Sequence, residues 1–465
     1  MEKNSISRRL FLKSSALAGA AGMVGTGTAT GLLTSCQSAA DNAPKYTPLR
    51  EPGTYYAPDL PDKAADGRLL KAGLIGCGGR GTGAVGNFLD AADNVTITAI
   101  GDVFKDKVES TAKNLKENRG IDIPENMRFS GLDAYKQVID SGIDVVLVAT
   151  PPYFRPIHFK YAVEKGVHCF LEKPIFVDSA GYLSVMLSAR RAKENNLCVF
   201  VGTQRNHTRK YIEGFKQVMN GLIGDITGGI VFWNGSVPWV RSRQPGWTEG
   251  EWMIRDWVNW KWLSGDHIVE QHVHNIDVFT WFSGLKPVSA EGVGSRQRRP
   301  SGDQYDNFSI DFVMENGIHV HSMCRQITDC SSHNNEFIQG TKGSFSCSEG
   351  RSPAEIKDLK GNVIWSYDTE AEREKFKQTQ AMVLEHVALI DHIRAGKQKE
   401  QVSEIAVSNM MAVMGREAAY TGRVVKWDDM TKSDIDVIPS DFSLTGKMDL
   451  SKIKVPVPGA DMPIR

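Results

Sequence analysis

Short runs of apolar residues alternate with amphipathic stretches through the first half of the chain. An apolar strand at 71–75 leads through a glycine-rich turn into an amphipathic helix, and a second strand follows at 95–100. The continuous apolar run "IDVVLVATPP" and the later strand "VHCFLEKP" have the character of strands buried on both faces. Strands that alternate with helices in this way predict an α/β fold with a doubly wound parallel sheet, which binds its ligands at the carboxyl ends of the strands.

The turn after the first strand has the spacing of a dinucleotide-binding loop. Three of its glycines form the pattern G-x-G-x-x-G between a strand and a helix. In that context the first glycine permits a tight turn, the second allows a pyrophosphate to approach, and the third allows close packing of helix on strand. The pyrophosphate would bind at the amino terminus of the helix, where unpaired N–H groups favour an anion. The predicted loop residues are Gly76, Gly78, Gly79, Arg80 and Gly81.

Asp102 ends the second strand, 26 residues after Gly76, close to the position of a carboxylate that binds the ribose. A carboxylate there favours NAD because it would repel a 2′-phosphate, although Lys105 nearby leaves NADP open. An alternative role for Asp102 is to cap the next helix. The other predicted cofactor contacts follow later strands and are Thr150, Pro151, Glu172 and Lys173.

The first 36 residues have the pattern of an export signal rather than of a folded segment. Arg8 and Arg9, followed by "LFLK" and an Ala/Gly-rich apolar run, match the twin-arginine pattern. "LLTSC" resembles a lipobox, which predicts a lipid anchor at Cys36; a simple cleavage site beside an incidental cysteine is the alternative. Residues 37–68, rich in proline, predict an extended arm or tether. We expect a periplasmic protein, exported after folding with its cofactor bound, and tethered to the membrane if Cys36 is lipidated.

Charge and cysteine content exclude several classes of protein. The 465 residues include 55 basic and 55 acidic side chains, so bulk charge provides no attraction to nucleic acid. After the signal, no segment approaches the roughly 18 apolar residues of a membrane-spanning helix. The six cysteines beyond Cys36 form no Cys-x-x-Cys pairs, which argues against a zinc site and favours buried thiols.

The motifs "GLIGCGGRG", "ATPP" and "LEKP", in this order and spacing, resemble those of the Gfo/Idh/MocA oxidoreductases, which include sugar and inositol dehydrogenases. The resemblance covers roughly residues 69–425. It implies a Rossmann domain at 69–190, a C-terminal α/β domain at 191–430 with a large open, mostly antiparallel sheet, and a tail at 431–465. Strand-like runs such as "YDNFSIDFVM" and "IHVHSMC" fit the second domain. The resemblance also implies a homo-oligomer.

The resemblance assigns the chemistry to Lys173 and to the stretch "GDHIVEQHVHNIDVFTW". In the family the lysine of E-K-P reaches the reacting hydroxyl, where an ammonium stabilises negative charge on oxygen. Alignment of His274 and Asp277 with the family pattern H-x-x-D makes His274 the candidate base, with Glu270 and Asp277 as its orienters. On a single helix these three residues would share one face, and His272 would point away from it.

Two other interpretations of this stretch stay open. Its histidines and Glu270 could ligate zinc, but neither H-E-x-x-H nor H-x-x-E-H is present and the family works without metal, so no metal is predicted. The stretch could also be a hydrogen-bonded polar face with no catalytic role.

Tryptophans mark the expected substrate site, because aromatic faces stack on sugar rings. Seven of the ten tryptophans lie between residues 233 and 262. Core packing or a subunit interface is the alternative for this cluster, and a capping or solvent-facing role is the alternative for Arg155. The predicted substrate contacts are Arg155, Gln204, Arg205, Trp239 and Trp260.

The sequence therefore predicts an NAD(P)-dependent oxidoreductase that transfers a hydride from a hydroxyl of a sugar, polyol or glycoside. Because free NAD is scarce outside the cytoplasm, we expect a tightly bound cofactor that is recycled in place. A glycoside-cleaving enzyme that oxidises its substrate transiently is one alternative, and a non-catalytic periplasmic sugar-binding protein is another.

Overall fold

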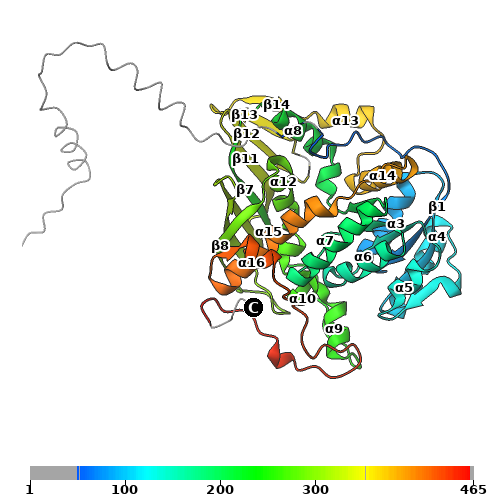
Figure 1. Cartoon of the computed structure of the whole chain (residues 1–465). Helices are drawn as coiled ribbons and strands as arrows, with labels where there is room; N and C mark the ends of the chain where they lie inside the picture. The colour runs from blue at the N-terminus through cyan, green and yellow to red at the C-terminus, as the bar shows by residue number, and fades with distance from the viewer. Residues whose placement is uncertain (1–49, 52, 351, 461–465) are drawn as a thin grey trace, which may run out of the picture. The chain divides into compact units, whose positions relative to one another are not determined.

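The computed structural model describes residues 50, 51, 53–350 and 352–460 (Figure 1). The predicted export signal and the candidate lipid anchor Cys36 lie outside the described residues. Within those residues, no helix has the length and apolar character needed to cross a membrane. All six described cysteines are free thiols, and five of them are buried while Cys330 is exposed.

Six parallel strands form the first sheet, in the order β3-β2-β1-β4-β5-β6. Their bounds are β1 Leu70–Ile75, β2 Val95–Asp102, β3 Arg128–Ser130, β4 Val145–Val148, β5 His168–Leu171 and β6 Val199–Val201. Strand β4 is buried at every residue, as its continuous apolar sequence predicted, and β6 is also buried at every residue. The order reverses at β1 and β4, which places a ligand crevice at their carboxyl ends. The predicted doubly wound fold is confirmed.

The helices that surround this sheet pack in two groups. Helix α3 lies against α14, whereas α6 contacts both α5 and α7 (Figure 1). The helices of the described chain are α3 Gly79–Ala91, α4 Lys105–Arg119, α5 Ala134–Ile139, α6 Arg155–Glu164, α7 Ser179–Glu194, α8 Arg209–Met219, α9 Glu249–Arg255, α10 Lys261–Ser264, α11 His267–Glu270, α12 Val273–Ser283, α13 Thr369–Lys375, α14 Ala381–Arg394, α15 Val402–Thr421 and α16 Trp427–Thr431. Short 3-10 helices are η1 Glu125–Met127, η2 Pro152–Phe154, η3 Gln204–His207, η4 Trp257–Asn259 and η5 Leu450–Lys452.

The parallel sheet extends beyond residue 190, where the sequence predicted the end of the first domain. That position falls inside α7, and the chain continues from this helix into β6. Strand β6 pairs in parallel with β5, with Cys169 opposite Val199, so it completes the same sheet. Backbone pairing therefore places the change of domain after residue 201.

The second sheet has nine strands in the order β14-β13-β12-β11-β7-β10-β9-β8-β15. Its only parallel pair within the described chain is β7 with β10, so it is mostly antiparallel, as predicted. Helices α12 and α15 pack on it (Figure 1), and β9 alternates between buried and half-buried residues. The bounds are β7 Ile226–Gly235, β8 Pro287–Ser295, β9 Asn307–Met314, β10 His319–Gln326, β11 His333–Gly340, β12 Gly343–Ser348, β13 Glu355–Asp358, β14 Val363–Ser366 and β15 Val425–Lys426.

The described part of the predicted tether packs on the fold instead of extending from it. Arg50 Nη1 donates to the carbonyl oxygen of Trp281 at 2.7 Å, and Trp281 Nε1 donates to the carbonyl oxygen of Tyr56 at 2.9 Å. Leu60 and Ala64 are buried in the main hydrophobic core, which includes residues of both domains. The described residues of this segment, 50, 51 and 53–68, thus include contacts with both domains and do not form a free tether.

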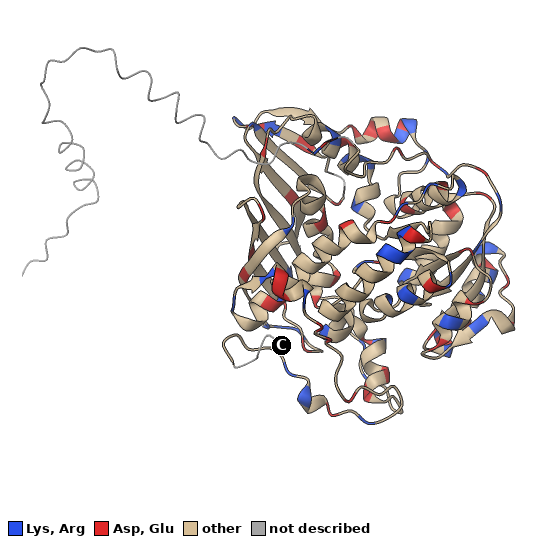
Figure 2. Ribbon diagram, viewed as in Figure 1, with Lys and Arg blue, Asp and Glu red and all other residues tan. Residues whose placement is uncertain are grey.

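The C-terminal tail is also part of the packed structure. Its backbone N–H at Val437 donates to Asp178 Oδ2 at 3.0 Å, at the start of α7. Met448 is buried with Trp262 in a separate apolar cluster that includes residues of α9 and α10. The tail therefore fixes the segment that carries α9. Basic and acidic side chains are interspersed over both domains (Figure 2).

Candidate functional site

The glycine-rich loop has the geometry that a pyrophosphate site requires. Gly76 has φ of +98°, and a Cβ there would lie 2.7 Å from the backbone of Ala149. A Cβ at Gly81 would lie 1.8 Å from the carbonyl oxygen of Gly76, so helix and strand approach too closely for a side chain. At Gly78 and Gly79 a Cβ would meet nothing within 4 Å. Backbone N–H groups at the start of α3 are therefore open to an anion, and a dinucleotide fits this loop.

This difference between glycines gives a testable prediction. Gly81→Ala should lower the free energy of unfolding by about 1–3 kcal/mol or more, because the new methyl group collides with backbone. Gly78→Ala should unfold like the wild type and yet weaken dinucleotide binding, since its methyl group would project into open space beside the loop. Thermal unfolding and dinucleotide titration of both variants measure this. Equal unfolding temperatures for the two variants would contradict it.

Asp102 shapes the loop and also borders the cleft beside it. Its Oδ2 accepts from the N–H of Cys77 at 2.7 Å and its Oδ1 accepts from the N–H of Phe104 at 2.9 Å. Burial raises the pKa of this carboxyl. The cleft has a volume of about 560 Å³. The predicted cofactor residues that line it are Gly76, Gly78, Gly79, Arg80, Gly81, Asp102, Thr150 and Pro151.

Glu172 and Lys173, adjacent after β5, contact different parts of the molecule. Lys173 Nζ donates to the carbonyl oxygen of Glu270 and lies 3.1 Å from its Oε1. The buried carboxylate of Glu172 accepts from Arg80 Nε, and Arg80 Nη2 lies 3.4 Å from Glu385 of α14. Burial raises the pKa of Glu385 well above its ordinary value. Arg80 therefore joins the glycine-rich loop to the strand end that carries Lys173.

Arg155 connects two strand ends from inside the protein. Its Nε donates to the carbonyl oxygen of Thr150 at 2.9 Å and its Nη1 donates to that of Pro174 at 2.6 Å. Burial lowers the pKa of its guanidinium to about 10. The predicted contact with a sugar does not match this placement, because Arg155 is buried and two of its donors are used by main-chain oxygens.

His274 is buried, and the charge of Lys173 acts on its imidazole. Its ring stacks on that of Trp233, with centroids 5.9 Å apart and planes at 20°. Its Nδ1 is buried without a hydrogen-bond partner among the described residues. Burial, with the positive charges of Lys173, Arg205 and Arg80, lowers the pKa of His274 well below its ordinary value. An imidazole in this environment is uncharged at neutral pH and free to accept a proton.

The predicted single helical face is wrong, because the stretch forms two helices. Helix α11 ends at Glu270 and α12 begins three residues later, so the spacing between Glu270 and His274 crosses a break. Asp277 accepts from Ser408 Oγ at 2.7 Å, and Glu270 faces the lysine. Among the described residues, neither carboxylate has a hydrogen bond with His274. The ring is positioned by Trp233 instead.

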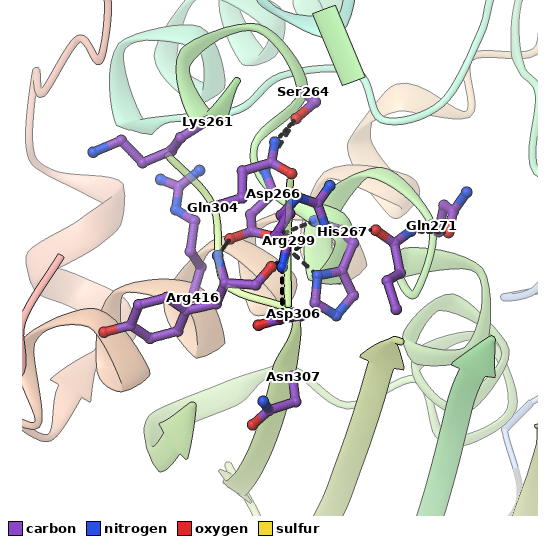
Figure 3. A network of polar contacts seen from close by, with 12 residues as sticks. Lys261, Ser264, Asp266, His267, Gln271, Arg299, Gln304, Asp306, Asn307 and Arg416 are labelled. Atoms are coloured by element: carbon purple, nitrogen blue, oxygen red, sulfur yellow. Dashed lines mark hydrogen bonds and ion pairs between the residues drawn. The ribbon is translucent and has the colours of Figure 1, made fainter. Parts of the chain in front are cut away.

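The other histidines of the stretch are held by structural hydrogen bonds. His272 lies behind the site, where its Nε2 is 2.7 Å from Ser322 Oγ and its Nδ1 is 3.3 Å from Asn275 Oδ1. His267 Nδ1 lies 2.9 Å from Asp266 Oδ1, in the polar network shown in Figure 3. In the ranges that the structure describes, no group of three or more His, Cys, Asp or Glu side chains could hold a metal ion.

Asp277 gives a prediction for the pH dependence of stability. Burial raises its pKa from 3.8 to about 6, so the folded protein binds a proton here that the unfolded chain has lost. Protonation of Asp277 therefore stabilises the folded protein by about 2–3 kcal/mol below about pH 4, and this stabilisation is lost as the pH rises through 6. Asp277→Asn removes the titration and keeps an acceptor for Ser408. Urea unfolding from pH 4 to 7 should show the free energy of unfolding of the wild type falling relative to that of the variant. A difference between the two free energies that stays constant over this range would contradict the prediction.

Arg205 and Gln204 bind within the protein. Arg205 is paired with the buried Glu336, donates to Asn334 Oδ1 at 2.9 Å, and lies 3.2 Å from Glu349 Oε2. Gln204 Nε2 donates to Glu349 Oε1 at 3.3 Å. These contacts connect η3 to β11 and the loop after β12. The structure thus shows Arg205 as a buried cross-link, not as a group presented to a sugar.

The two tryptophans predicted as substrate contacts have different environments. Trp260 is buried and packs edge to face on Trp252, with centroids 5.1 Å apart, so core packing describes it. Trp239 is 45% exposed and lines the same cleft as Asp102. The alternative of core packing therefore describes Trp260, whereas the substrate contact predicted for Trp239 stays a prediction.

Three contributors to the site were missed in the sequence. Trp233 was counted among the tryptophans, but its place near the end of β7 could have indicated a role at the site. Glu385 is 305 residues from its partner Arg80 and left no local signal. Arg255 of α9 pairs with Asp106 of the first domain, which no spacing could have indicated.

Known proteins with similar sequences cover both domains. The family described as "Oxidoreductase family, NAD-binding Rossmann fold" matches residues 70–203, and "GFO/IDH/MocA C-terminal domain" matches residues 216–346. A "Glycosyl hydrolase family 109 protein" of Streptomyces coelicolor is 29% identical over 226 residues, 48% of this chain and 44% of that protein. The "scyllo-inositol 2-dehydrogenase (NAD(+))" of Bacillus subtilis is 22% identical over 236 residues, 51% of this chain and 60% of that protein.

Solved structures of similar fold cover more of the chain. The aldose-aldose oxidoreductase from Caulobacter crescentus, complexed with glycerol, has a TM-score of 0.62 at 18% identity over 77% of this chain and 100% of that one. The scyllo-inositol dehydrogenase from Lactobacillus casei with bound NAD(H) and scyllo-inositol has a TM-score of 0.58 at 18% identity. The match covers 77% of this chain and 99% of that one. These likenesses show the fold.

The two family matches together cover more than half of the chain, and the first of them ends just after β6, where the sheets change. The chain spans about half the length of the curated relatives it matches. It belongs to the Gfo/Idh/MocA oxidoreductase family, with an NAD-binding Rossmann domain followed by that family's C-terminal domain.

Proposed function

We propose that this protein is an NAD(P)-dependent oxidoreductase that oxidises a hydroxyl of a sugar, polyol or glycoside. The observation that carries the proposal is the position of Lys173, which follows the end of β5, is held by Glu270, and contributes to the lowered pKa of His274. In a doubly wound sheet this is the edge where the reacting end of a dinucleotide and its substrate meet. The inositol dehydrogenase and aldose oxidoreductase among its relatives support a polyhydroxylated substrate.

The residues divide the chemistry between them. A bound nicotinamide supplies the hydride acceptor. His274 accepts the proton of the substrate hydroxyl, and its low pKa keeps the ring unprotonated beforehand. Lys173 stabilises the negative charge that develops on that oxygen, while Glu270 holds the ammonium in place. Trp233 sets the orientation of the imidazole.

We also propose that the protein acts in the periplasm, exported folded by the twin-arginine route with a retained cofactor. The paired Arg8 and Arg9 support the route, and the lipobox-like "LLTSC" supports a lipid anchor at Cys36. Cell fractionation, with mass analysis of the mature amino terminus, tests both. A cytoplasmic protein that keeps its first residues would refute them.

One experiment tests the activity itself. The purified protein is incubated with NAD, then NADP, and a panel of sugars, polyols and glycosides, while reduced-nicotinamide absorbance and products are followed together. The proposal expects reduction of the cofactor, with an oxidised product, for at least one hydroxyl compound. A protein that binds no dinucleotide, or that binds it and changes no compound, would refute it.

A glycoside-cleaving enzyme is the second candidate, favoured by the glycosyl hydrolase family 109 relatives. Such an enzyme oxidises one hydroxyl, eliminates the aglycone, and then returns the hydride. Lys173 argues against it, because members of the family with this activity tend to lack E-K-P. In the same incubation, release of a free sugar from a glycoside without net change of the cofactor would identify this activity.

A further inference from the structure

We propose that residues 236–258, a segment of the C-terminal half, form the binding site for the adenosine half of the dinucleotide and retain it. The inference rests on the proposed function, because it takes a dinucleotide as the ligand. It concerns residues outside the Rossmann domain, and no spacing in the sequence connects them with a nucleotide.

The cleft has one wall from each domain. The Rossmann wall includes Asp102, at the position expected to contact the ribose, and Phe104. The opposite wall includes Trp239, Arg241 and Trp257. Aromatic and guanidinium groups are the side chains that stack on nucleobases. The second wall therefore has the composition of an adenine site, and it lines the same cleft as Asp102.

A cross-domain contact holds this wall against the Rossmann domain. Arg255 donates from two nitrogens to Asp106, at 2.9 and 3.1 Å. Its guanidinium also lies 3.7 Å from the ring centre of Phe104 and 4.8 Å from that of Trp247. A bidentate pair with aromatic contacts fixes orientation as well as distance. The cleft is thereby covered at its adenosine end by the other domain.

The wall is built on a buried scaffold. Asp256 Oδ1 accepts from the N–H of Arg241 at 2.7 Å, and Asn259 Nδ2 donates to the carbonyl oxygen of Trp239 at 3.2 Å. Both scaffold side chains are fully buried. Arg241 lies over the Trp239 ring at 5.0 Å, yet Trp239 remains 45% exposed. A large aromatic ring that is rigidly anchored but open to a cleft is suited to a ligand's flat face.

Binding of NAD and of ADP-ribose, which keeps the adenosine half and lacks the nicotinamide, tests the inference. Trp239→Ala removes a ring of the wall, and Asp106→Asn breaks the cross-domain pair. We expect each variant to bind both ligands about tenfold more weakly than wild type, in line with the loss of one stacking contact. Titration calorimetry gives the affinities, and stopped-flow displacement gives the dissociation rates.

Two matched variants serve as controls. Asp90→Asn breaks the comparable bidentate pair with Arg119, whose Nη1 and Nη2 lie 2.6 and 3.1 Å from Asp90. Trp365→Ala removes a half-buried tryptophan of β14 that does not line the cleft. Both should bind NAD and ADP-ribose as wild type does.

The outcomes separate the inference from the proposed function. If wild type binds both ligands and the two cleft variants match it, or if only NAD binding weakens, the inference is overturned while the dinucleotide proposal stands. If wild type binds neither ligand, both fail. Weaker binding of both ligands by the cleft variants supports the inference even if no sugar is oxidised.

Discussion

Lys173→Ala is expected to reduce kcat for hydroxyl oxidation by about a hundredfold to a thousandfold, the usual effect of losing one charge-stabilising donor at a developing oxyanion. Because the ammonium acts most strongly in the transition state, kcat and kcat/KM should fall by similar factors. Steady-state kinetics on any compound that reduces the cofactor measures this. Thermal unfolding of the variant separates the effect from misfolding, since Glu270 loses its partner.

Lys160→Ala is the matched control for that variant. Lys160 is an exposed lysine whose ammonium lies 2.6 Å from Glu164 on the same helix, far from the strand end. Its loss should leave kcat unchanged. If Lys173→Ala retained wild-type kcat, the catalytic assignment would be wrong and the alternative of a non-catalytic sugar-binding protein would regain support.

Arg205→Met is expected to lower the free energy of unfolding by about 3–5 kcal/mol, the cost of leaving a buried carboxylate without its partner. Glu336 is fully buried, and besides Arg205 it accepts hydrogen bonds from Tyr211 and Asn275. The substitution removes the positive charge and preserves much of the side-chain volume. Urea unfolding at pH 7 measures the difference.

Arg191→Met is the control, since Arg191 is 56% exposed and its pair with Glu164 at 3.3 Å is solvent-screened. Surface pairs of this kind contribute about 0–1 kcal/mol. A variant of Arg205 that unfolds like wild type but raises KM for a sugar would restore the sequence-based prediction of a substrate contact.

The distinction between local and distant contacts explains which site residues the sequence could indicate. The loop from Gly76 to Gly81 could be predicted because the tight turn between strand and helix requires glycines at fixed positions within a few consecutive residues. Lys173 lies just after the end of β5, so its place at the carboxyl edge of the sheet could also be predicted. The fold class followed for the same reason, since alternating strands and helices are encoded in local periodicity.

The partners of these residues depended on tertiary structure. The sequence-based prediction placed Glu270 and His274 on one helix, but the helix is interrupted between them. Helical spacing does not predict which side chains share a face across such an interruption. Glu270 instead faces Lys173, 97 residues away. The sequence predicted that Arg155 donates to a substrate. In the structure it is buried between two strand ends, where two of its nitrogens donate to main-chain oxygens.

The sequence by itself determined that this protein has a dinucleotide-binding domain, a lysine at its ligand edge, and a second, mostly antiparallel domain. Only the tertiary structure decided that Trp233 orients His274, that Arg205 is a buried cross-link, and that Arg255 joins α9 to Asp106. The physical reason is that period and turn chemistry act between near neighbours, whereas burial and ion pairing depend on which distant segments the fold brings together.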